Sequence, residues 1–433
     1  NSILSHISAI CRIVPIDRSA DICYTTVSPC GRRAERNENL STAIKKRQNR
    51  TPTSPALDPQ VAAPAKERNM GIELFRIVAM CLVLMLHVLG RGGVMGVTSK
   101  FSPQYITAHA LEAIAYCCVD CYAIITGFTN VKSRFRYRRI VLLWLEVFTI
   151  TVSSTLIAKF FFHVDVTPDE WKIALMPLTR RELWYFNAYF ILFFFIPILN
   201  KGVQALERWQ LRTTILTLLA AIMILTRLGD RDIFYVSSGY SAMWLMVLYL
   251  IGAYFRLYGF PKFAKWYVTL PTFFLCAGIA LGQKLIAQKM ISDGTLVKED
   301  WLYKNESFLS YISPCMVLMA VCLLIFFGNL KIRFKVSKVI ISNLGKATFG
   351  VFALHVATMV WNHYFKGRFA EVGKYPAPKM LLFVILITLG LFLVFSAYSL
   401  ARIYLFKLLR INRLVDLIAD RLPFKKKQDS ANG

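Results

Sequence analysis

Long apolar runs separated by short polar connections make up the chain from residue 70 to residue 406. Most runs have roughly the 17–25 residues that a helix needs to cross a bilayer. Their residues do not alternate between apolar and polar, as those of a membrane β-barrel would, so helices are expected. The pattern predicts an all-α fold, a polytopic membrane helix bundle with about ten transmembrane helices. The predicted spans are 72–89, 106–128, 140–162, 183–199, 213–226, 240–255, 266–286, 308–327, 347–361 and 380–406.

The composition excludes several classes of protein. Of the 433 residues, 56% are hydrophobic and only 18% are charged, and the mean hydropathy is +0.48. Soluble domains carry about 25% charged residues, so a soluble enzyme, a disordered chain and a disulfide-stapled secreted module are all excluded. The net charge of +27 is typical of a membrane protein that keeps Lys and Arg in its cytoplasmic loops. No recognition motif accompanies this charge, so no nucleic-acid partner is expected.

The chain divides into three segments by composition. Residues 1–69 are rich in Arg, Lys, Ser and Pro and lack an apolar run long enough for a signal peptide. They are predicted to form a disordered, basic cytoplasmic leader. Residues 70–406 form the transmembrane domain, and residues 407–433 form a basic cytoplasmic tail. The lysines at 425–427 of this tail are expected to lie near anionic membrane lipids.

The charges of the loops predict the orientation of the bundle. The connections after the even-numbered spans, together with the tail, carry 23 Lys and Arg residues, and the connections after the odd-numbered spans carry 14. Acidic residues show the opposite distribution, with 4 in the first set and 11 in the second. Because Lys and Arg are retained on the cytoplasmic side, the first set is predicted to be cytoplasmic. Both termini would then be cytoplasmic, and the protein would be integral to the plasma (inner) membrane.

The first span carries polar residues that a membrane helix does not need. Glu73, Arg76 and His87 lie in the segment GIELFRIVAMCLVLMLHVLG. Eleven residues make about three helical turns, so Arg76 and His87 would share one face, roughly 16 Å apart along the helix axis. Glu73 lies one turn before Arg76 and can pair with it. The layout indicates either an anion grip with a titratable base deeper in the membrane, or a snorkelling arginine and a histidine that bonds between helices.

Several segments resemble the acyltransferase 3 family of integral-membrane acyltransferases. The arginine and histidine of the first span, separated by ten residues, are similar to the pattern of that family. Four later segments resemble its other motifs in order, within a resemblance that runs from about residue 70 to about residue 405. They are VDCYAIITGF (119–128), RYRRI (136–140), LWYFNAYFILFFFIPILN (183–200) and LGKATFGVFALHV (344–356). The sequence departs from the family at Glu73, Cys121 and Thr126, where aspartate, an aromatic residue and serine are usual.

The resemblance implies an enzyme that transfers an acyl group, acetyl by default, from cytoplasmic acyl-coenzyme A to a hydroxyl of an extracytoplasmic or lipid-linked glycan. His87 matches the family's essential histidine, and Arg76 matches its essential arginine. A neutral imidazole, whose ordinary pKa is near 6.5, is suited to accept the proton of the attacking hydroxyl. Coenzyme A carries phosphates, which the basic side chains of Arg136, Arg138 and Arg139 can hold at the inner face. Acyl-coenzyme A enters as the donor substrate, and no tightly bound cofactor is expected.

The other candidate residues have two interpretations each. Asp120 either orients His87, as part of the catalytic group, or pairs with a cation. Trp184 and Tyr185 either contact the substrate or belong to the aromatic belt at the membrane surface. Glu73 is assigned to the substrate-binding side through its neighbouring arginine.

No metal site is expected from the sequence. The cysteines at 117, 118 and 121 lack a matching Cys/His pair and are interpreted as helix-packing residues. His355 and Asn200 are interpreted as residues that form hydrogen bonds at helix ends.

Two other functions remain as alternatives. A transporter or flippase for a glycan or lipid would usually show internal repeats with helices broken at matched positions, and no such symmetry is visible. A non-catalytic membrane scaffold or sensor would not need the pair of Arg76 and His87. The sequence indicates neither the acceptor, nor the acyl chain, nor the oligomeric state.

Overall fold

The computed structural model describes residues 69–133, 138–178, 183–228, 232–295 and 308–421. The predictions for the leader, for Arg136 and for the lysines of the tail concern residues outside these ranges, apart from Asn69. Helices dominate the described part, and no strand occurs in it. The main helices are α2 (Met70–Leu89), α3 (Pro103–Ala115), α4 (Cys118–Asn130), α5 (Arg138–Phe161), α6 (Pro168–Leu175), α7 (Trp184–Ala205), α8 (Arg208–Leu228), α9 (Ala242–Tyr258), α10 (Trp266–Ser292), α12 (Pro314–Asn329), α13 (Lys335–His355), α14 (Ala377–Leu408) and α15 (Ile411–Arg421). Short helical turns are η2 (Met95–Val97), η4 (Ser237–Gly239), η5 (Val360–Phe365) and η6 (Ala370–Lys374).

The all-helical membrane fold is confirmed, but the count of about ten spans is not. Within the described ranges, 7 helices are long and apolar enough to cross a membrane, with α3 and α4 together forming one of them. An eighth is reached if α13 and the segment Val360–Lys374, which meet at 81°, form one broken span. The remaining two predicted spans fall on α9 and α12, which are apolar but only 17 and 16 residues long. The hydropathy pattern predicts where these helices lie. Their bends and ends depend on contacts between distant parts of the chain, which hydropathy does not record.

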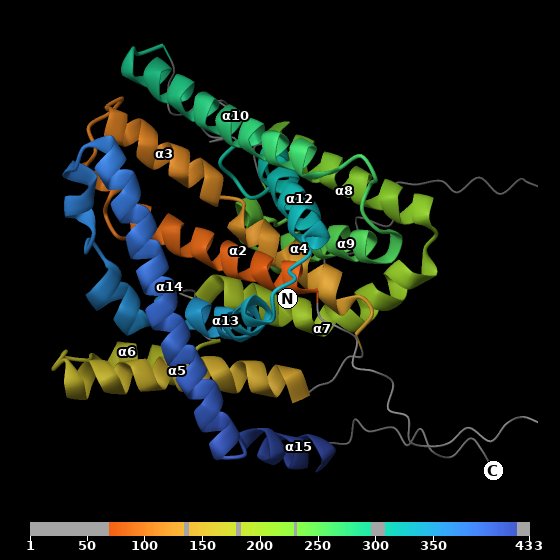
Figure 1. Ribbon diagram of the computed structural model, residues 1–433, viewed down its shortest axis with the longest axis vertical. Coiled ribbons are helices and arrows are strands. Elements are labelled where there is room, and N and C mark those ends of the chain that lie inside the picture. Colours follow the sequence, from red (N-terminus) through yellow and green to blue (C-terminus); the bar gives the residue numbers. More distant parts are fainter. Residues whose placement is uncertain (1–68, 134–137, 179–182, 229–231, 296–307, 422–433) are drawn as a thin grey trace, which may run out of the picture. The chain divides into compact units, whose positions relative to one another are not determined.

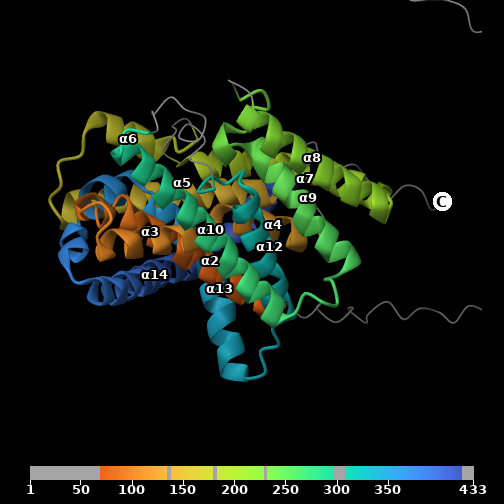
Figure 2. The same cartoon turned by 90° about the horizontal axis from the view of Figure 1, so that it is seen from above.

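Helix α2 lies in the middle of the bundle in both views (Figures 1 and 2), where it contacts α3, α4, α12, α13 and α14. Asn69 caps its first turn, because Oδ1 accepts hydrogen bonds from the backbone N–H groups of Gly71 and Ile72 at 2.9 and 3.3 Å. The Asn69 amide also donates to the carbonyl of Gly328 at the end of α12, at 3.2 Å. The helix that carries Arg76 and His87 is therefore fixed on several sides.

Glycine allows α4 and α9 to cross at close range. A Cβ atom at Gly127 would lie 2.0 Å from the backbone oxygen of Tyr249, and one at Gly252 would lie 2.0 Å from that of Ile124. Small residues at such crossings let helices pack in a membrane, where no hydrophobic force drives them together. A side chain at either position would push the two helices apart.

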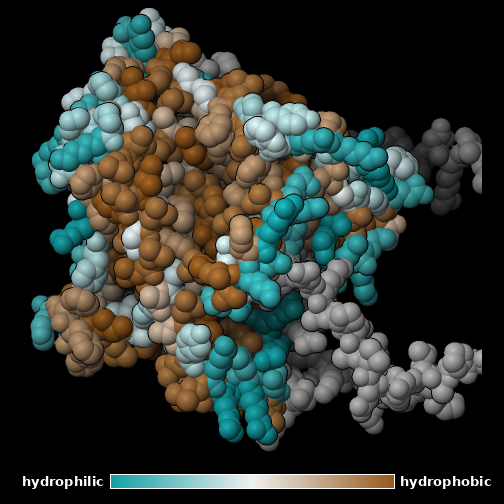
Figure 3. Space-filling view, viewed as in Figure 1, coloured by the Kyte–Doolittle hydropathy of each residue, from teal (hydrophilic) through white to brown (hydrophobic). Residues whose placement is uncertain are grey.

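The surface of the bundle is largely apolar. Figure 3 shows a broad brown face bordered by teal residues at its left and right edges. Large apolar side chains point outward from α8, α10 and α14, among them Leu216, Leu275 and Leu393. An apolar surface of this extent would be unfavourable in water, and it identifies an integral membrane protein.

Charged side chains inside the spans pair between helices. Lys284 on α10 donates to Glu112 on α3 at 2.7 Å, and the same carboxylate oxygen lies 2.8 Å from His109 Nδ1. Arg402 on α14 forms a salt bridge with Glu146 on α5. Pairing offsets part of the cost of charge in the membrane and holds the bundle around the central helix.

Candidate active site

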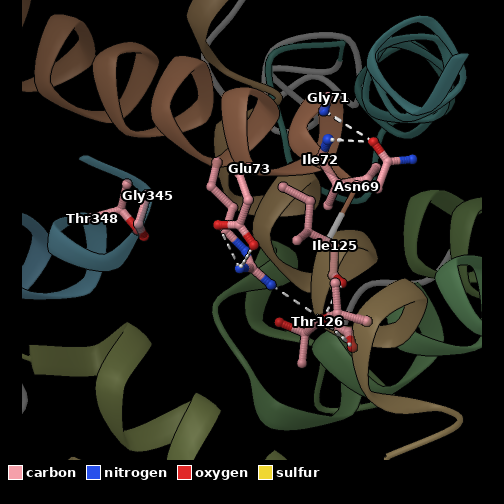
Figure 4. Close-up of polar contacts among 10 residues, drawn as sticks. Asn69, Gly71, Ile72, Glu73, Ile125, Thr126, Gly345 and Thr348 are labelled. Atoms are coloured by element: carbon pink, nitrogen blue, oxygen red, sulfur yellow. Dashed lines mark hydrogen bonds and ion pairs between the residues drawn. The ribbon is translucent and has the colours of Figure 1, made fainter. Parts of the chain in front are cut away.

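Arg76 is held near the start of α2 by two neighbours. Its Nη1 donates to both carboxylate oxygens of Glu73, at 2.9 and 3.1 Å, and its Nη2 donates to Thr129 Oγ1 on α4 at 3.3 Å. Glu73 lies beside Gly345 of α13 (Figure 4), where a Cβ atom would be 2.7 Å from Glu73 Oε2. The glycine leaves room for the carboxylate. The ion pair that the spacing of Glu73 and Arg76 predicts is therefore present.

A cavity of about 290 Å³, here called the Arg76 pocket, opens beside this pair. Arg76 and Lys346 both line it and contribute positive charge. The carboxylate of Glu146 also lines it, but this group is bound by Arg402 from outside the pocket. Arg76 is paired with Glu73, and Glu146 is paired with Arg402, so Lys346 is the lining cation that has no carboxylate partner among the described residues. This uncompensated positive charge favours an anionic ligand.

A second cavity of about 210 Å³, here called the His87 pocket, lies at the far end of α2. Its lining is mostly aromatic. The rings of Trp184, Tyr240 and Tyr311 form one packed group, with centroid distances of 4.5, 5.0 and 6.3 Å. Asn362 contributes an amide to the same lining. Flat rings with a few polar groups are suited to a ligand with an apolar face and polar edges.

His87 forms a hydrogen-bonded pair with His355, the last residue of α13. His87 Nδ1 lies 3.0 Å from His355 Nε2, and His355 Nδ1 lies 3.2 Å from the carbonyl oxygen of Val351. A carbonyl can only accept, so His355 Nδ1 carries the proton of the neutral ring and its Nε2 accepts. His87 Nδ1–H is then the donor, and His87 Nε2 keeps its lone pair. This arrangement fixes the tautomer that a general base requires.

The two pockets share a wall of three aromatic side chains. Tyr122, Tyr185 and Phe352 line both cavities. The ring of Tyr185 lies 6.4 Å from that of Tyr122 and 5.3 Å from that of Phe352. Tyr122 also donates to the backbone carbonyl of Arg76 at 2.9 Å. The wall therefore separates an arginine-lined cavity from a histidine-lined one along a single helix.

Asp120 does not orient His87. The carboxylate is fully buried, and its Oδ1 accepts a hydrogen bond from Trp244 Nε1 on α9 at 3.1 Å. Its Oδ2 has no hydrogen-bond partner among the described residues. The contact with His87 is not observed among the described residues, because this carboxylate bonds to Trp244 of α9, and the alternative of a cation partner is also not observed there. Asp120 instead links α4 to α9.

The basic residues predicted to hold the donor lie at the start of α5. Arg138 is bound to Asp416 of α15, at 2.7 Å, and Arg139 is exposed. Neither residue is part of the Arg76 pocket lining, but Leu143 and Glu146, one and two turns further along α5, are. Arg139, Leu143 and Glu146 share a helix face, so Arg139 lies in line with the pocket.

Trp184 and Tyr185 both lie at the His87 pocket, as the substrate-contact interpretation expects. Several lining residues were not predicted, among them Lys346, Trp361 and Asn362, and His355 was assigned only a helix-end role. His355 lies in the segment LGKATFGVFALHV (344–356), which resembles a family motif, so the sequence did contain a signal for this residue. Lys346 lies within the quoted segment 344–356 but was not singled out there, and nothing in the local sequence distinguishes Trp361 and Asn362 from ordinary loop or helix residues.

Among the described residues, no three His, Cys, Asp or Glu side chains gather as metal ligands would. The fold identifies an integral-membrane protein, and its candidate site consists of two neighbouring pockets with a shared aromatic wall. The model of the acyltransferase 3 family, described as an acyltransferase domain, matches residues 69–399. The match covers more than half of the chain, and the protein therefore belongs to this family of membrane acyltransferases. No curated protein and no solved structure matches the chain.

Proposed function

We propose that the protein transfers an acyl group, acetyl by default, from cytoplasmic acyl-coenzyme A to a hydroxyl of an extracytoplasmic or lipid-linked glycan. The observation that carries this proposal is the pair of pockets with a common wall. One pocket is lined by Arg76 and Lys346, and the other is lined by His87, whose Nε2 carries no proton in the tautomer that the hydrogen bonds of His355 favour. Donor and acceptor can thus approach from opposite sides of the membrane without exchanging places.

The Arg76 pocket is suited to the donor. Coenzyme A joins a polyanionic nucleotide to a long, thin arm that ends in the thioester. Arg76 and Lys346 can hold its phosphates or the polar groups of the arm, and Arg139 adds a cation in line with the pocket. The rise between Arg76 and His87 is about 16 Å, so the arm can follow α2 toward the wall.

His87 Nε2 is suited to act as the general base. The acceptor hydroxyl gives its proton to this nitrogen as its oxygen attacks the thioester carbonyl carbon. When the carbon–sulfur bond breaks, the imidazolium returns the proton to the coenzyme A thiolate. His355 holds the imidazole in the required tautomer through the 3.0 Å hydrogen bond at Nδ1. The products are the glycan ester and free coenzyme A.

The aromatic lining of the His87 pocket supports a sugar as acceptor. A pyranose ring has apolar faces formed by its C–H groups and hydroxyls around its edge. The rings of Trp184, Tyr240 and Tyr311 offer flat apolar surfaces, and Asn362 offers an amide for the hydroxyls.

The test is transfer by purified protein in lipid nanodiscs, with acetyl-coenzyme A and a panel of p-nitrophenyl glycosides. Products should be measured by mass spectrometry, because the described part of the chain holds free cysteines that would react with thiol reagents. His87→Ala should lower transfer by roughly 10²–10⁴-fold in a folded, inserted protein. Transfer by the unchanged protein should also fall at acidic pH, because a protonated imidazole cannot accept a proton.

The matched control is His109→Gln, which removes a different imidazole, one that is buried and lines neither pocket. It should keep near-normal turnover. If His87→Ala keeps normal turnover with an unchanged pH profile, His87 is a packing residue and the proposed mechanism is wrong. If the unchanged protein moves a labelled glycan across a vesicle but releases no coenzyme A, the flippase alternative replaces it.

A further inference from the structure

The segment that follows α13 turns back to the His87 pocket. It meets α13 at 81° and begins with a π-helical turn, Val360–Phe365. Trp361 and Asn362 of this turn line the pocket. Single π-helical turns are rare and occur frequently at functional sites. The contacts that hold this turn in place therefore bear on the geometry of the site.

Arg91, two residues after the end of α2, supplies such contacts. Its Nη2 donates to Asn362 Oδ1 at 2.9 Å, and its Nε donates to the backbone carbonyl of Trp361 at a longer 3.4 Å. Its guanidinium carbon lies 5.3 Å from the centre of the Trp361 ring. These contacts reach two successive residues of the turn and fix both its backbone and its side chains. A guanidinium suits this role because it donates in several directions while it stacks on a ring.

Backbone hydrogen bonds hold the main chain around Arg91, and they do not involve the Arg91 side chain. Gly367 N–H donates to the carbonyl of Arg91 at 2.9 Å, and Phe369 N–H donates to that of Gly92 at 2.8 Å. These bonds do not involve the guanidinium, so they remain when the Arg91 side chain is shortened. The segment after α2 and the segment at 367–369 therefore stay joined without the Arg91 side chain, which contacts the π-helical turn instead.

Trp361 connects this clamp to the base. Its ring meets the imidazole of His87 edge-on, with 4.9 Å between centroids and an interplanar angle of 88°. The His87 imidazole has a second contact, the hydrogen bond from its Nδ1 to His355. With both contacts in place, rotation of the His87 ring is restricted and Nε2 keeps one direction.

We propose that Arg91 is a positioning residue for acyl transfer. It clamps the π-helical turn so that Trp361 holds the His87 imidazole in its reactive orientation. This inference rests on the proposed function, because it takes His87 as the general base. Arg91 itself accepts no proton and forms no bond to the transferred group.

The kinetic test combines single and double substitutions under the assay described above. Arg91→Ala should lower kcat by about 10- to 100-fold, the effect expected for a misplaced catalytic group, and leave KM for acetyl-coenzyme A nearly unchanged. Arg91→Lys should recover only part of the loss, since an ammonium cannot stack and donate in the same way. Because Arg91 acts through Trp361, the double variant with Trp361→Ala should lose little more than Trp361→Ala alone. Losses that multiply would show independent roles and overturn the proposal.

A second measurement follows the clamp without any turnover. Hydrogen exchange of residues 357–369, read by mass spectrometry, should speed up in Arg91→Ala. The matched control is Lys374→Met, which removes an exposed ion pair with Glu371 from the same connection and should change neither exchange nor kcat. Unchanged exchange in Arg91→Ala would overturn the clamp. If the unchanged protein released no coenzyme A, the proposed function would fall, and exchange would still decide whether Arg91 holds the turn.

Discussion

The histidine pair gives the most direct test of how the site works. His355→Phe keeps a ring of similar size in a position that is fully buried, but it removes the acceptor for His87 Nδ1–H. The His87 ring then gains freedom to rotate and to move its proton to Nε2. Either change removes the lone pair that faces the acceptor, while Arg76 and its pocket are untouched.

The size of the effect follows from the contact that is lost. One neutral hydrogen bond is worth about 0.5–1.5 kcal/mol net, and about 1.4 kcal/mol corresponds to tenfold. We therefore expect His355→Phe to lower kcat by about 2- to 12-fold, far less than the loss of the base itself. KM for acetyl-coenzyme A should stay nearly constant. His355→Gln, whose side-chain oxygen can accept from Nδ1–H, should recover part of the activity.

The assay is initial-rate transfer by purified variants over a range of donor concentrations, with insertion checked by proteolysis. His109→Gln again serves as the control for the loss of a buried imidazole. The reasoning is refuted if folded His355→Phe keeps kcat within about twofold of the unchanged protein. It is also refuted if the loss appears in KM for the donor rather than in kcat.

Three further predictions concern the donor, the topology and one ion pair outside the spans. Arg76→Lys should raise KM for acetyl-coenzyme A, since a point charge cannot replace a bidentate guanidinium. Arg139→Glu should also raise this KM and weaken the dependence of KM on salt concentration. Normal donor binding in both inserted variants would contradict these expectations. Reporters fused after Lys331 and after Lys425 should both be cytoplasmic, and opposite signals would break the predicted topology. Burial raises the pKa of Glu170, but hydrogen bonds from its histidine and threonine neighbours outweigh it and hold the pKa below its usual value. Glu170→Gln should thus lower the free energy of unfolding at neutral pH by less than about 1 kcal/mol, and the difference should disappear as the pH falls through the lowered pKa of this carboxylate. Thermal unfolding across pH measures it, and a constant difference would refute it.

The sequence predicted those parts of the site that lie on one helix. Arg76 and Glu73 are three residues apart, and helical geometry alone brings their side chains together. His87 and its partner His355 are 268 residues apart, and periodicity does not say which helices become neighbours. For the same reason neither interpretation of Asp120, as a partner of His87 or of a cation, included Trp244. The bond to Trp244 depends on how α4 and α9 cross.

The count of about ten spans is not confirmed, for a related reason. Hydropathy predicts that a segment is apolar, but the length of a helix depends on where its ends find partners. α12 begins at Pro314, where Ser313 caps the helix by accepting from the backbone N–H of Cys315. The preceding residues 308–313 are apolar enough to extend the predicted span but are not helical. The break after α13 likewise follows contacts from the end of α2, which no local pattern records.

A single helix that carries both the arginine and the histidine has a consequence for the chemistry we propose. The separation of about 16 Å between Arg76 and His87 is set by the helix and does not depend on loops. A donor anchored at one end therefore presents its thioester at a fixed depth, provided that its arm is long and thin. The wall of Tyr122, Tyr185 and Phe352 stands between the two pockets, so what crosses must be narrow. In the reaction we propose, the bulky, charged nucleotide of the donor would stay on the side of Arg76, and only the acyl group on its flexible arm would reach the wall. The acceptor would stay on the side of His87, so the proposed transfer would need no transport of either substrate across the membrane.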